Sequence, residues 1–140
     1  MSGSLKSAPS KTRLSFQEIS AALAKFTFPE VDAVVGVREG GVMPAGLVAH
    51  QLNLPLYFLA INFRAPDNRP RHESPKLLRE PELLPEADAR VLLVDDVSVS
   101  GQTFVKAMES LEGRSIVTFA LKGRADFVLF PEIESCVSWP

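Results

Sequence analysis

The feature of this sequence that most constrains its fold is a short apolar run that ends in two carboxylates. Residues 91–94 are all valine or leucine, and Asp95 and Asp96 follow them directly. A run of this length and composition is typical of a strand that is buried on both faces of a parallel sheet. Polar groups at the carboxyl end of such a strand lie where open α/β sheets bind ligands. The run therefore predicts an α/β protein with a site at Asp95 and Asp96.

The residues after the acidic pair form the pattern of an anion-binding loop. A turn of small residues, 97–101, leads into residues 102–111, whose apolar side chains recur at helical spacing. Backbone N–H groups of such a turn, together with the N-terminus of the following helix, favour a bound phosphate. Hydroxyl groups are supplied by Ser98, Ser100 and Thr103. Because carboxylates repel phosphate, we expect the acidic pair to meet sugar hydroxyls or a metal ion instead.

Two other protein classes also place carboxylates at the end of an apolar strand. A P-loop NTPase does so, but the sequence has no G-x-x-x-x-G-K-[ST] motif, which excludes that class. A response-regulator receiver carries its acidic pair at the first strand, whereas the earlier strand here ends in Arg38-Glu39-Gly40-Gly41, which disfavours that class. A strand that ends in an ordinary polar turn is the remaining alternative.

Composition limits the chain to one domain and argues against several kinds of partner. The sequence has 140 residues and a net charge of −2, which suits a single globular domain without an overall basic footprint for nucleic acid. Its one cysteine, Cys136, allows no intrachain disulfide and fits a reducing compartment. No apolar run reaches membrane-spanning length, and the first residues lack the apolar core of a signal peptide. We therefore expect a cytoplasmic domain over residues 11–140, preceded by a flexible Ser-rich N-terminus over 1–10.

Apolar periodicity predicts an alternation of strands and helices around the central run. Ser15 and Glu18 form a capping box at the start of a first helix that ends near Pro29. A second helix is expected over 42–52, and extended segments over 31–37, 55–61, 115–121, 126–130 and 135–139. This alternation predicts a twisted, mainly parallel sheet flanked by helices, with a site along the carboxyl ends of the strands.

A second loop suited to a ligand follows the strand over 31–37. Paired glycines, Gly40 and Gly41, connect that strand to the next helix and permit a ligand to approach the backbone closely. A Gly-Gly turn without a ligand is the alternative.

The stretch from 62 to 88 breaks the alternation. It contains five of the eleven prolines and a cluster of basic residues, Arg64, Arg69, Arg71, Lys76 and Arg79. A long irregular stretch in a compact domain is usually functional or disordered. We expect a mobile lid whose cations close over a polyphosphate, and a solvated loop is the alternative. An RNA-binding arm is disfavoured because the stretch lacks interleaved aromatic residues beyond Phe63.

The central stretch resembles the phosphoribosyl-pyrophosphate (PRPP) motif of type I phosphoribosyltransferases, and the element order resembles bacterial xanthine-guanine and hypoxanthine-guanine enzymes. The resemblance rests on the apolar strand, the paired carboxylates and a turn that ends in Ser100-Gly101-Gln102-Thr103. It implies that Asp95 and Asp96 are catalytic residues that hold the ribose hydroxyls. The residues implied for the 5′-phosphate are Ser98, Val99, Ser100, Gly101, Gln102 and Thr103.

The resemblance also assigns roles outside the central stretch. It implies that Arg38, Glu39, Gly40 and Gly41 contact pyrophosphate, with Arg38 as a catalytic cation. Mg²⁺ would be held mainly through the substrate, with Asp95 and Asp96 as the candidate protein ligands. Lys122 would donate to an exocyclic oxygen of the base. A small C-terminal hood would cover the base, with Cys136 at the stacking position, Val137 offering its backbone and Trp139 near enough to stack instead.

Three positions depart from the family pattern. Glu39 replaces a basic residue, Val99 replaces the aspartate that handles the proton on purine N7, and Cys136 replaces the stacking aromatic. The main expectation is a Mg²⁺-dependent phosphoribosyltransferase of purine salvage, which joins a nitrogenous base to PRPP. We expect the base to be a purine and the protein to form a homodimer. The departures leave open a catalytically degenerate regulator of the same fold that binds PRPP or a nucleotide. An RNA-binding attenuator of this fold would need a basic face, which the sequence lacks outside 62–88.

Overall fold

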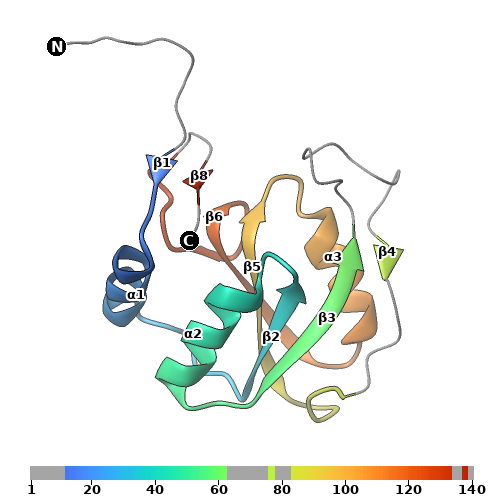
Figure 1. Cartoon of the computed structure of the whole chain (residues 1–140). Helices are drawn as coiled ribbons and strands as arrows, with labels where there is room; N and C mark the ends of the chain where they lie inside the picture. The colour runs from blue at the N-terminus through green and yellow to red at the C-terminus, as the bar shows by residue number, and fades with distance from the viewer. Residues whose placement is uncertain (1–11, 63–75, 78–82, 134–136, 139–140) are drawn as a thin grey trace, which may run out of the picture.

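The computed structural model of the chain describes residues 12–62, 76–77, 83–133 and 137–138 (Figure 1). Its helices are α1 (Phe16–Lys25), α2 (Val42–Leu52) and α3 (Gln102–Ser110). Its strands are β1 (Thr12–Arg13), β2 (Ala33–Arg38), β3 (Leu56–Asn62), β4 (Lys76–Leu77), β5 (Arg90–Ser98), β6 (Ser115–Gly123), β7 (Phe127–Val128) and β8 (Val137–Ser138). The flexible N-terminus expected over 1–10 lies outside the described residues.

The main sheet has the strand order β4-β3-β2-β5-β6-β7. Its strands run parallel from β3 to β7, and β4 pairs antiparallel with β3 at the edge. The remaining strands, β1 and β8, pair in parallel as a separate small sheet. The predicted α/β class with a twisted, mainly parallel sheet is confirmed.

The order of the parallel strands reverses between β2 and β5. These two strands are neighbours in the sheet, with Ala33 opposite Val91 and Gly36 opposite Val94. From β2 the chain passes through α2 to β3, whereas from β5 it passes through α3 to β6 on the other side of the pair. The two connections therefore diverge at the carboxyl ends of β2 and β5. A point where the strand order reverses in this way is where open α/β sheets bind ligands.

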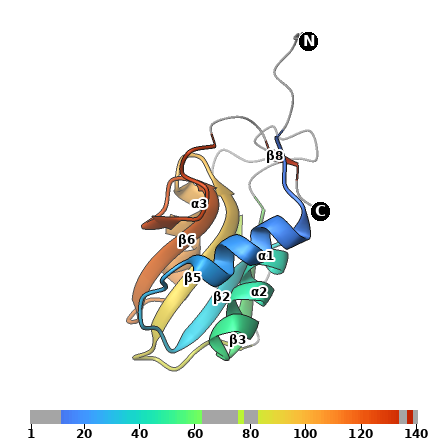
Figure 2. The ribbon, with the colours of Figure 1, turned by 90° about the vertical axis from the view of Figure 1, so that its left-hand side faces the viewer.

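Helices cover both faces of the sheet, with α1 and α2 on one face and α3 on the other (Figure 2). Each central strand contributes alternate side chains to two apolar cores. Val34, Leu92 and Phe119 pack with α1 and α2, whereas Val35, Leu93 and Ala120 pack with α3. Burial on both faces explains why residues 91–94 are apolar without alternation.

Two helix boundaries follow directly from local sequence. The predicted capping box is confirmed, because the Glu18 N–H donates to Ser15 Oγ and the Ser15 N–H donates to Glu18 Oε1, both at 3.0 Å. Helix α2 spans Val42–Leu52, as predicted, and ends at Asn53 in the left-handed conformation with φ 56°.

The central strand is longer than the apolar run suggested. The prediction that the strand ends before the acidic pair is wrong, because β5 continues through Asp95 and Asp96 to Ser98. Pairing with β6 extends it, with Val97 opposite Lys122 and Ser98 opposite Gly123. Backbone hydrogen bonds to a neighbouring strand thus override the polarity of the local sequence. The loop after β5 consequently begins at Val99.

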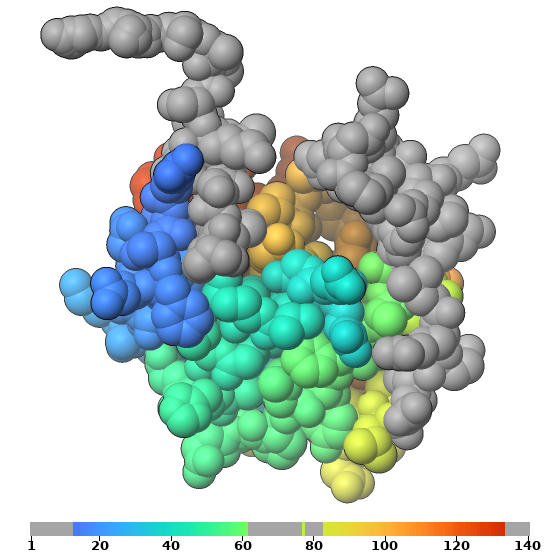
Figure 3. All heavy atoms as spheres, in the orientation of Figure 1, coloured from blue at the N-terminus to red at the C-terminus, as the bar shows by residue number. Residues whose placement is uncertain are grey.

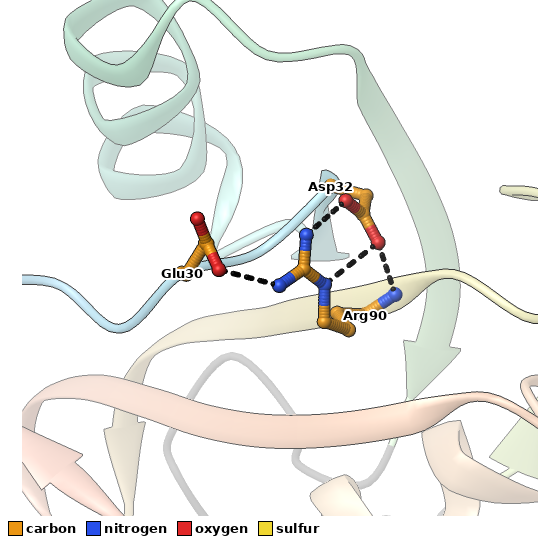
Figure 4. Close-up of polar contacts among 3 residues, drawn as sticks. All are labelled: Glu30, Asp32 and Arg90. Carbon is orange, nitrogen blue, oxygen red and sulfur yellow. Dashed lines mark hydrogen bonds and ion pairs between the residues drawn. The ribbon is translucent and has the colours of Figure 1, made fainter.

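A cluster of three charged residues lies at the amino-terminal ends of β2 and β5, opposite the ends from which the loops leave (Figure 4). Arg90 Nη2 lies 2.7 Å from Asp32 Oδ1, Arg90 Nε donates to Asp32 Oδ2 at 3.1 Å, and Arg90 Nη1 lies 2.8 Å from Glu30 Oε1. The Arg90 N–H also donates to Asp32 Oδ2 at 2.8 Å. These bonds join the start of β5 to the residue before β2, and they lower the pKa of Asp32 to about 2. The cluster aligns the two central strands from the end far from their loops.

Parts of the 62–88 stretch are packed against the body of the domain. Leu77 of β4 pairs with Ile61 of β3, and the buried Pro85 accepts hydrogen bonds through its carbonyl from Arg114 Nε at 3.1 Å and Nη2 at 2.6 Å. Residues 63–75 and 78–82 lie outside the described ranges, and the mobile lid stays a prediction.

The two elements expected to form a C-terminal hood lie in different sheets. Strand β7 is the edge strand of the main sheet beside β6, with Phe127 opposite Phe119. Strand β8 pairs instead with β1, with Thr12 opposite Val137. The strand predicted for the hood, β8, thus pairs with β1 near the start of the chain, a long-range pairing that local periodicity does not reveal.

The expected homodimer stays a prediction. No helix in the part of the chain that the structure describes is long and apolar enough to cross a membrane.

Candidate functional site

Two loops lie together at the carboxyl ends of β2 and β5. The glycine turn, residues 38–41, joins β2 to α2, and the hydroxyl loop, residues 99–103, runs from β5 into α3. In the space-filling view the cyan atoms around the glycine turn lie close to the gold atoms of the segment that ends β5 (Figure 3). The sequence prediction that these two loops border one site is consistent with their place at the point where the strand order reverses.

The glycine turn packs against both strands and against the acidic pair. A Cβ atom on Gly41 would lie 2.6 Å from the carbonyl oxygens of Val37 and of Val94, so the turn is seated between β2 and β5. A Cβ atom on Gly40 would lie 2.5 Å from Asp96 Oδ1 and 2.7 Å from Asp96 Oδ2. The Arg38–Glu39 peptide bond is cis. Both glycines are therefore required by close packing, and Gly40 brings the turn into contact with the Asp96 carboxylate.

The two carboxylates of the acidic pair differ in their surroundings. Alternation along β5 places Asp96 on the α2 side with Val94, and Asp95 on the α3 side with Leu93. Asp95 is only 8% exposed, whereas Asp96 is half-buried. The Asp96 N–H donates to Asp95 Oδ1 at 2.8 Å, and the Val97 N–H donates to Asp96 Oδ1 at 2.7 Å. These bonds fix the orientation of both carboxyl groups at the strand end.

Burial raises the pKa of Asp95 well above its ordinary value, and the charge of Asp96 raises it further. A carboxylate with few water contacts beside a second carboxylate is poorly stabilised when it is ionised. A ligand that donates hydroxyl groups to the pair, or a cation beside it, would supply the missing stabilisation. A carboxyl group whose pKa is raised by burial and by a second carboxylate is a candidate for a functional site.

The hydroxyl loop leaves the N-terminus of α3 without a side-chain cap. The N-cap residue is Gly101 in the left-handed conformation, with φ 83°, and it has no side chain to bind the first N–H groups. Ser100 Oγ accepts a hydrogen bond from the Gln102 N–H at 3.3 Å. Because the N-cap residue has no side chain, the N–H groups that follow Gln102 in the first turn of this nine-residue helix favour an anion. The phosphate cradle itself stays a prediction, with which this backbone geometry is compatible.

The residues predicted to hold phosphate do not all lie in this loop. Ser98 ends β5 and is only 6% exposed, whereas Val99 is 62% exposed and Ser100 is also exposed. Gln102 and Thr103 form the first turn of α3. The accessible part of the loop is therefore 99–103.

The residues predicted to contact pyrophosphate and the base are not all brought together by the described structure. Arg38 and Glu39 are exposed, and the Arg38 guanidinium carbon lies 6.0 Å from the centre of the Phe58 ring. Lys122 is half-buried in β6 opposite Val97 of β5. Val137 belongs to β8, and the positions proposed for stacking, Cys136 and Trp139, lie outside the described residues.

The donor groups of this edge fit Mg²⁺ bound together with a substrate. No three His, Cys, Asp or Glu side chains of the described ranges cluster as a metal site. Asp95 and Asp96 supply two carboxylates, and Mg²⁺ commonly takes one or two protein carboxylates along with substrate phosphates and water.

Sequence reasoning missed two contacts that hold the end of β6. Gly123 packs on the backbone of Ser98, and the Arg124 N–H donates to the Ser98 carbonyl at 2.7 Å. Asp126 Oδ2 accepts hydrogen bonds from the Thr118 N–H at 2.9 Å and from Thr118 Oγ1 at 3.1 Å. A glycine directly after Lys122 was the only local signal, because the partners are distant in the sequence.

Comparisons with known proteins agree with the fold. The orotate phosphoribosyltransferase of Phocaeicola vulgatus is 31% identical over 84 residues, which are 60% of this chain and 35% of that protein. The chain thus spans about a third of the length of the curated relatives it matches. A purine phosphoribosyltransferase from Pyrococcus horikoshii superimposes with a TM-score of 0.73 and 24% identity, over 93% of this chain and 92% of that one. The xanthine-guanine-hypoxanthine phosphoribosyltransferase of Helicobacter pylori gives a TM-score of 0.70 and 15% identity over the same shares.

The model of the family described as "Phosphoribosyl transferase domain" matches residues 11–122 of this chain. These residues include the glycine turn, the acidic pair, the hydroxyl loop and Lys122. This match covers most of the 140 residues. The chain belongs to the phosphoribosyl transferase domain family.

Proposed function

We propose that this protein transfers the ribose 5-phosphate of PRPP to a nitrogenous base and releases pyrophosphate. The observation that carries the proposal is the acidic pair flanked by two ligand-accessible loops where the strand order reverses. Gly40 contacts the Asp96 carboxylate on one side, and the uncapped start of α3 follows β5 on the other. Family membership and the phosphoribosyltransferases among its relatives support the same activity.

In this proposal PRPP is bound by three groups of residues. The hydroxyl loop and the first N–H groups of α3 receive the 5′-phosphate. The acidic pair accepts hydrogen bonds from the ribose hydroxyls, with Asp96 as the more accessible carboxylate. The glycine turn receives pyrophosphate through its backbone, with Arg38 as the neighbouring cation.

Catalysis in this arrangement is mostly positioning and charge stabilisation. As pyrophosphate leaves, the ribose C1 takes on oxocarbenium character, and a base nitrogen held on the opposite side forms the new bond. The acidic pair and the hydroxyl loop hold the ribose in place while pyrophosphate departs and the base nitrogen bonds to C1. Nearby carboxylates also stabilise positive charge on the sugar. Mg²⁺, when bound, would neutralise part of the charge of the pyrophosphate oxygens.

A 6-oxopurine is the base that we propose, with orotate as the competing candidate. Lys122 stands half-buried at the end of β6, where its ammonium can donate to an exocyclic oxygen. Both kinds of base carry such an oxygen. The curated relatives are named orotate phosphoribosyltransferases, whereas the solved structures of similar fold include enzymes named for purines.

A panel of free bases tests the activity and the base together. Hypoxanthine, guanine, xanthine, adenine and orotate are each incubated with PRPP and Mg²⁺, and pyrophosphate release is measured. We expect one or two 6-oxopurines to support release. Release with orotate alone would replace the purine proposal, and no release with any base would contradict the transferase proposal.

Binding variants separate the central motif from a structural turn. Asp95→Asn combined with Asp96→Asn should weaken binding of a nucleoside 5′-monophosphate through the ribose. Gly101→Val should weaken it more, because Gly101 has φ 83° and a β-branched residue there distorts the loop. Unchanged affinity of both variants by calorimetry would remove these residues from the site.

A second candidate function is a catalytically degenerate protein that binds a nucleotide and regulates another process. The exposed Glu39 in the glycine turn and the exposed Val99 in the hydroxyl loop favour it, because neither suits a polyphosphate or a proton transfer. Such a protein would bind a nucleoside monophosphate but bind PRPP weakly. Turnover of any base by the wild type would exclude this candidate.

A further inference from the structure

At the carboxyl ends of β5 and β6 the two backbones lie so close together that a side chain at position 123 would not fit between them. Ser98 and Gly123 are opposite each other in the ladder. A Cβ atom on Gly123 would overlap the Ser98 carbonyl oxygen and lie 2.8 Å from the Ser98 carbonyl carbon. The same oxygen accepts a hydrogen bond from the Arg124 N–H at 2.7 Å. The Ser98 carbonyl is therefore held in place by the backbone of residues 123 and 124.

This contact controls the start of the hydroxyl loop. The Ser98 carbonyl and the Val99 N–H belong to one planar peptide unit, so the position of the oxygen determines the direction of the N–H. Val99 is the first exposed residue after the buried Ser98. The backbone of β6 thus sets the direction in which the loop leaves the sheet, although β6 itself lies outside the loop.

The segment that follows β6, residues 123–126, is also held at its second end, by Asp126. Asp126 bonds to both the N–H and the hydroxyl of Thr118, and the Asp126 N–H donates back to Thr118 Oγ1 at 2.8 Å. Thr118 is buried in β6, four residues before Lys122. The segment from Lys122 to Asp126 is therefore bound to β6 at one end and to the start of the hydroxyl loop at the other.

We propose that Gly123 is a positioning residue that sets the 5′-phosphate-binding loop through its contact with Ser98 and couples that loop to Lys122. The proposal rests on the proposed function, because it takes the hydroxyl loop as the phosphate site. Gly123 itself touches no ligand. A side chain at position 123 would push the Ser98–Val99 peptide unit aside and misdirect the loop, while the glycine turn, on the other side of β5, would stay in place.

The test compares Gly123→Ala with a matched control, Gly113→Ala. Both glycines have positive φ, 103° and 90°, so both substitutions strain the backbone. Gly113 lies in a turn after α3, and among the described residues a Cβ there would meet the Ala87 carbonyl oxygen alone, at the ordinary contact distance of 3.6 Å. Calorimetry measures the binding of ribose 5-phosphate and, separately, of pyrophosphate with Mg²⁺, to the wild type and both variants at a temperature where thermal unfolding shows all three to be folded.

Gly123→Ala should weaken the binding of ribose 5-phosphate by about tenfold or more, because the loss of even one hydrogen bond to the charged phosphate lowers the affinity by about that factor. Pyrophosphate affinity should stay close to the wild-type value, and Gly113→Ala should change neither. Equal affinity of Gly123→Ala and wild type for ribose 5-phosphate would overturn the proposal, as would an equal loss for both ligands, which indicates general damage. Wild-type protein that binds neither ligand would contradict the proposed function itself.

Asp126→Ala is the second variant if Gly123→Ala does not fold. It releases the Thr118 end of the same turn without placing a new atom near Ser98. The same selective loss for ribose 5-phosphate, with pyrophosphate unchanged, is expected. An unchanged ratio of the two affinities would count against the coupling.

Discussion

Neutralising Glu39 should tighten the binding of pyrophosphate and PRPP. Two unit charges about 4 Å apart interact by about 1 kcal/mol in water and by about 4 kcal/mol at an effective dielectric of about 20. Glu39 is exposed, so its repulsion of a polyphosphate in the glycine turn belongs near the lower value. Because about 1.4 kcal/mol is tenfold in affinity, about 1 kcal/mol is about fivefold, so Glu39→Gln should tighten pyrophosphate binding by about fivefold and Glu39→Arg should tighten it further.

Calorimetry with pyrophosphate and Mg²⁺ at low and high salt measures this effect. The gain should shrink at high salt, because the screening length falls from about 10 Å at 0.1 M to about 3 Å at 1 M. Glu112→Gln is the matched control, since Glu112 is also exposed but follows the far end of α3. Affinities for Glu39→Gln within twofold of wild type would show that this carboxylate does not face pyrophosphate, and the charge argument would fail.

The same position distinguishes an enzyme from a regulator. In a working transferase Glu39→Arg should change turnover modestly, whereas Arg38→Ala should reduce it sharply, because Arg38 would be the neighbouring cation. In a regulator Glu39→Arg should create PRPP affinity that the wild type lacks. Steady-state rates and PRPP titrations of the three proteins are sufficient, and a wild-type rate that is unaffected by Arg38→Ala would contradict the assigned role.

Three further predictions concern stability. Gly41→Ala should lower the free energy of unfolding by about 1–3 kcal/mol, because the new Cβ would meet backbone oxygens of both central strands. Gly46→Ala should raise it by about 0.5–1 kcal/mol, because Gly46 lies within α2 and no described atom lies within 4 Å of its Cβ position. Urea unfolding measures both changes. Asp32→Asn should destabilise the protein above the ordinary aspartate pKa of 3.8, because Arg90 depresses the pKa of Asp32 to about 2. The difference should shrink as pH falls from 3.8 through 2, and a difference that does not shrink over this range would refute the argument. Asp95→Asn should stabilise the protein at neutral pH, and the gain should disappear as pH falls to 3.8, because the pKa of Asp95 is raised by burial and its protonated form carries no charge penalty; a gain that does not depend on pH would contradict this.

Local sequence was sufficient for the elements with strong local signals. The capping box at Ser15 and the bounds of α2 follow from interactions between residues at most a few positions apart. The continuous apolar run before Asp95 also predicted a strand that is covered on both faces, because only such a strand tolerates apolar residues at every position. The place of the acidic pair near the carboxyl end of a central strand followed from that fold class.

Tertiary structure decided how the strands end and which surfaces meet. Extension of β5 through Asp96 depends on a ladder with β6, and pairing of β8 with β1 joins opposite ends of the chain. The sequence by itself determined the α/β class and the residue types of the site, because periodicity and turn chemistry act over short distances. Contact of Gly40 with Asp96, the burial that separates Asp95 from Asp96 and the packing of Gly123 on Ser98 were decided only by the fold, because each joins groups that strand pairing brings together.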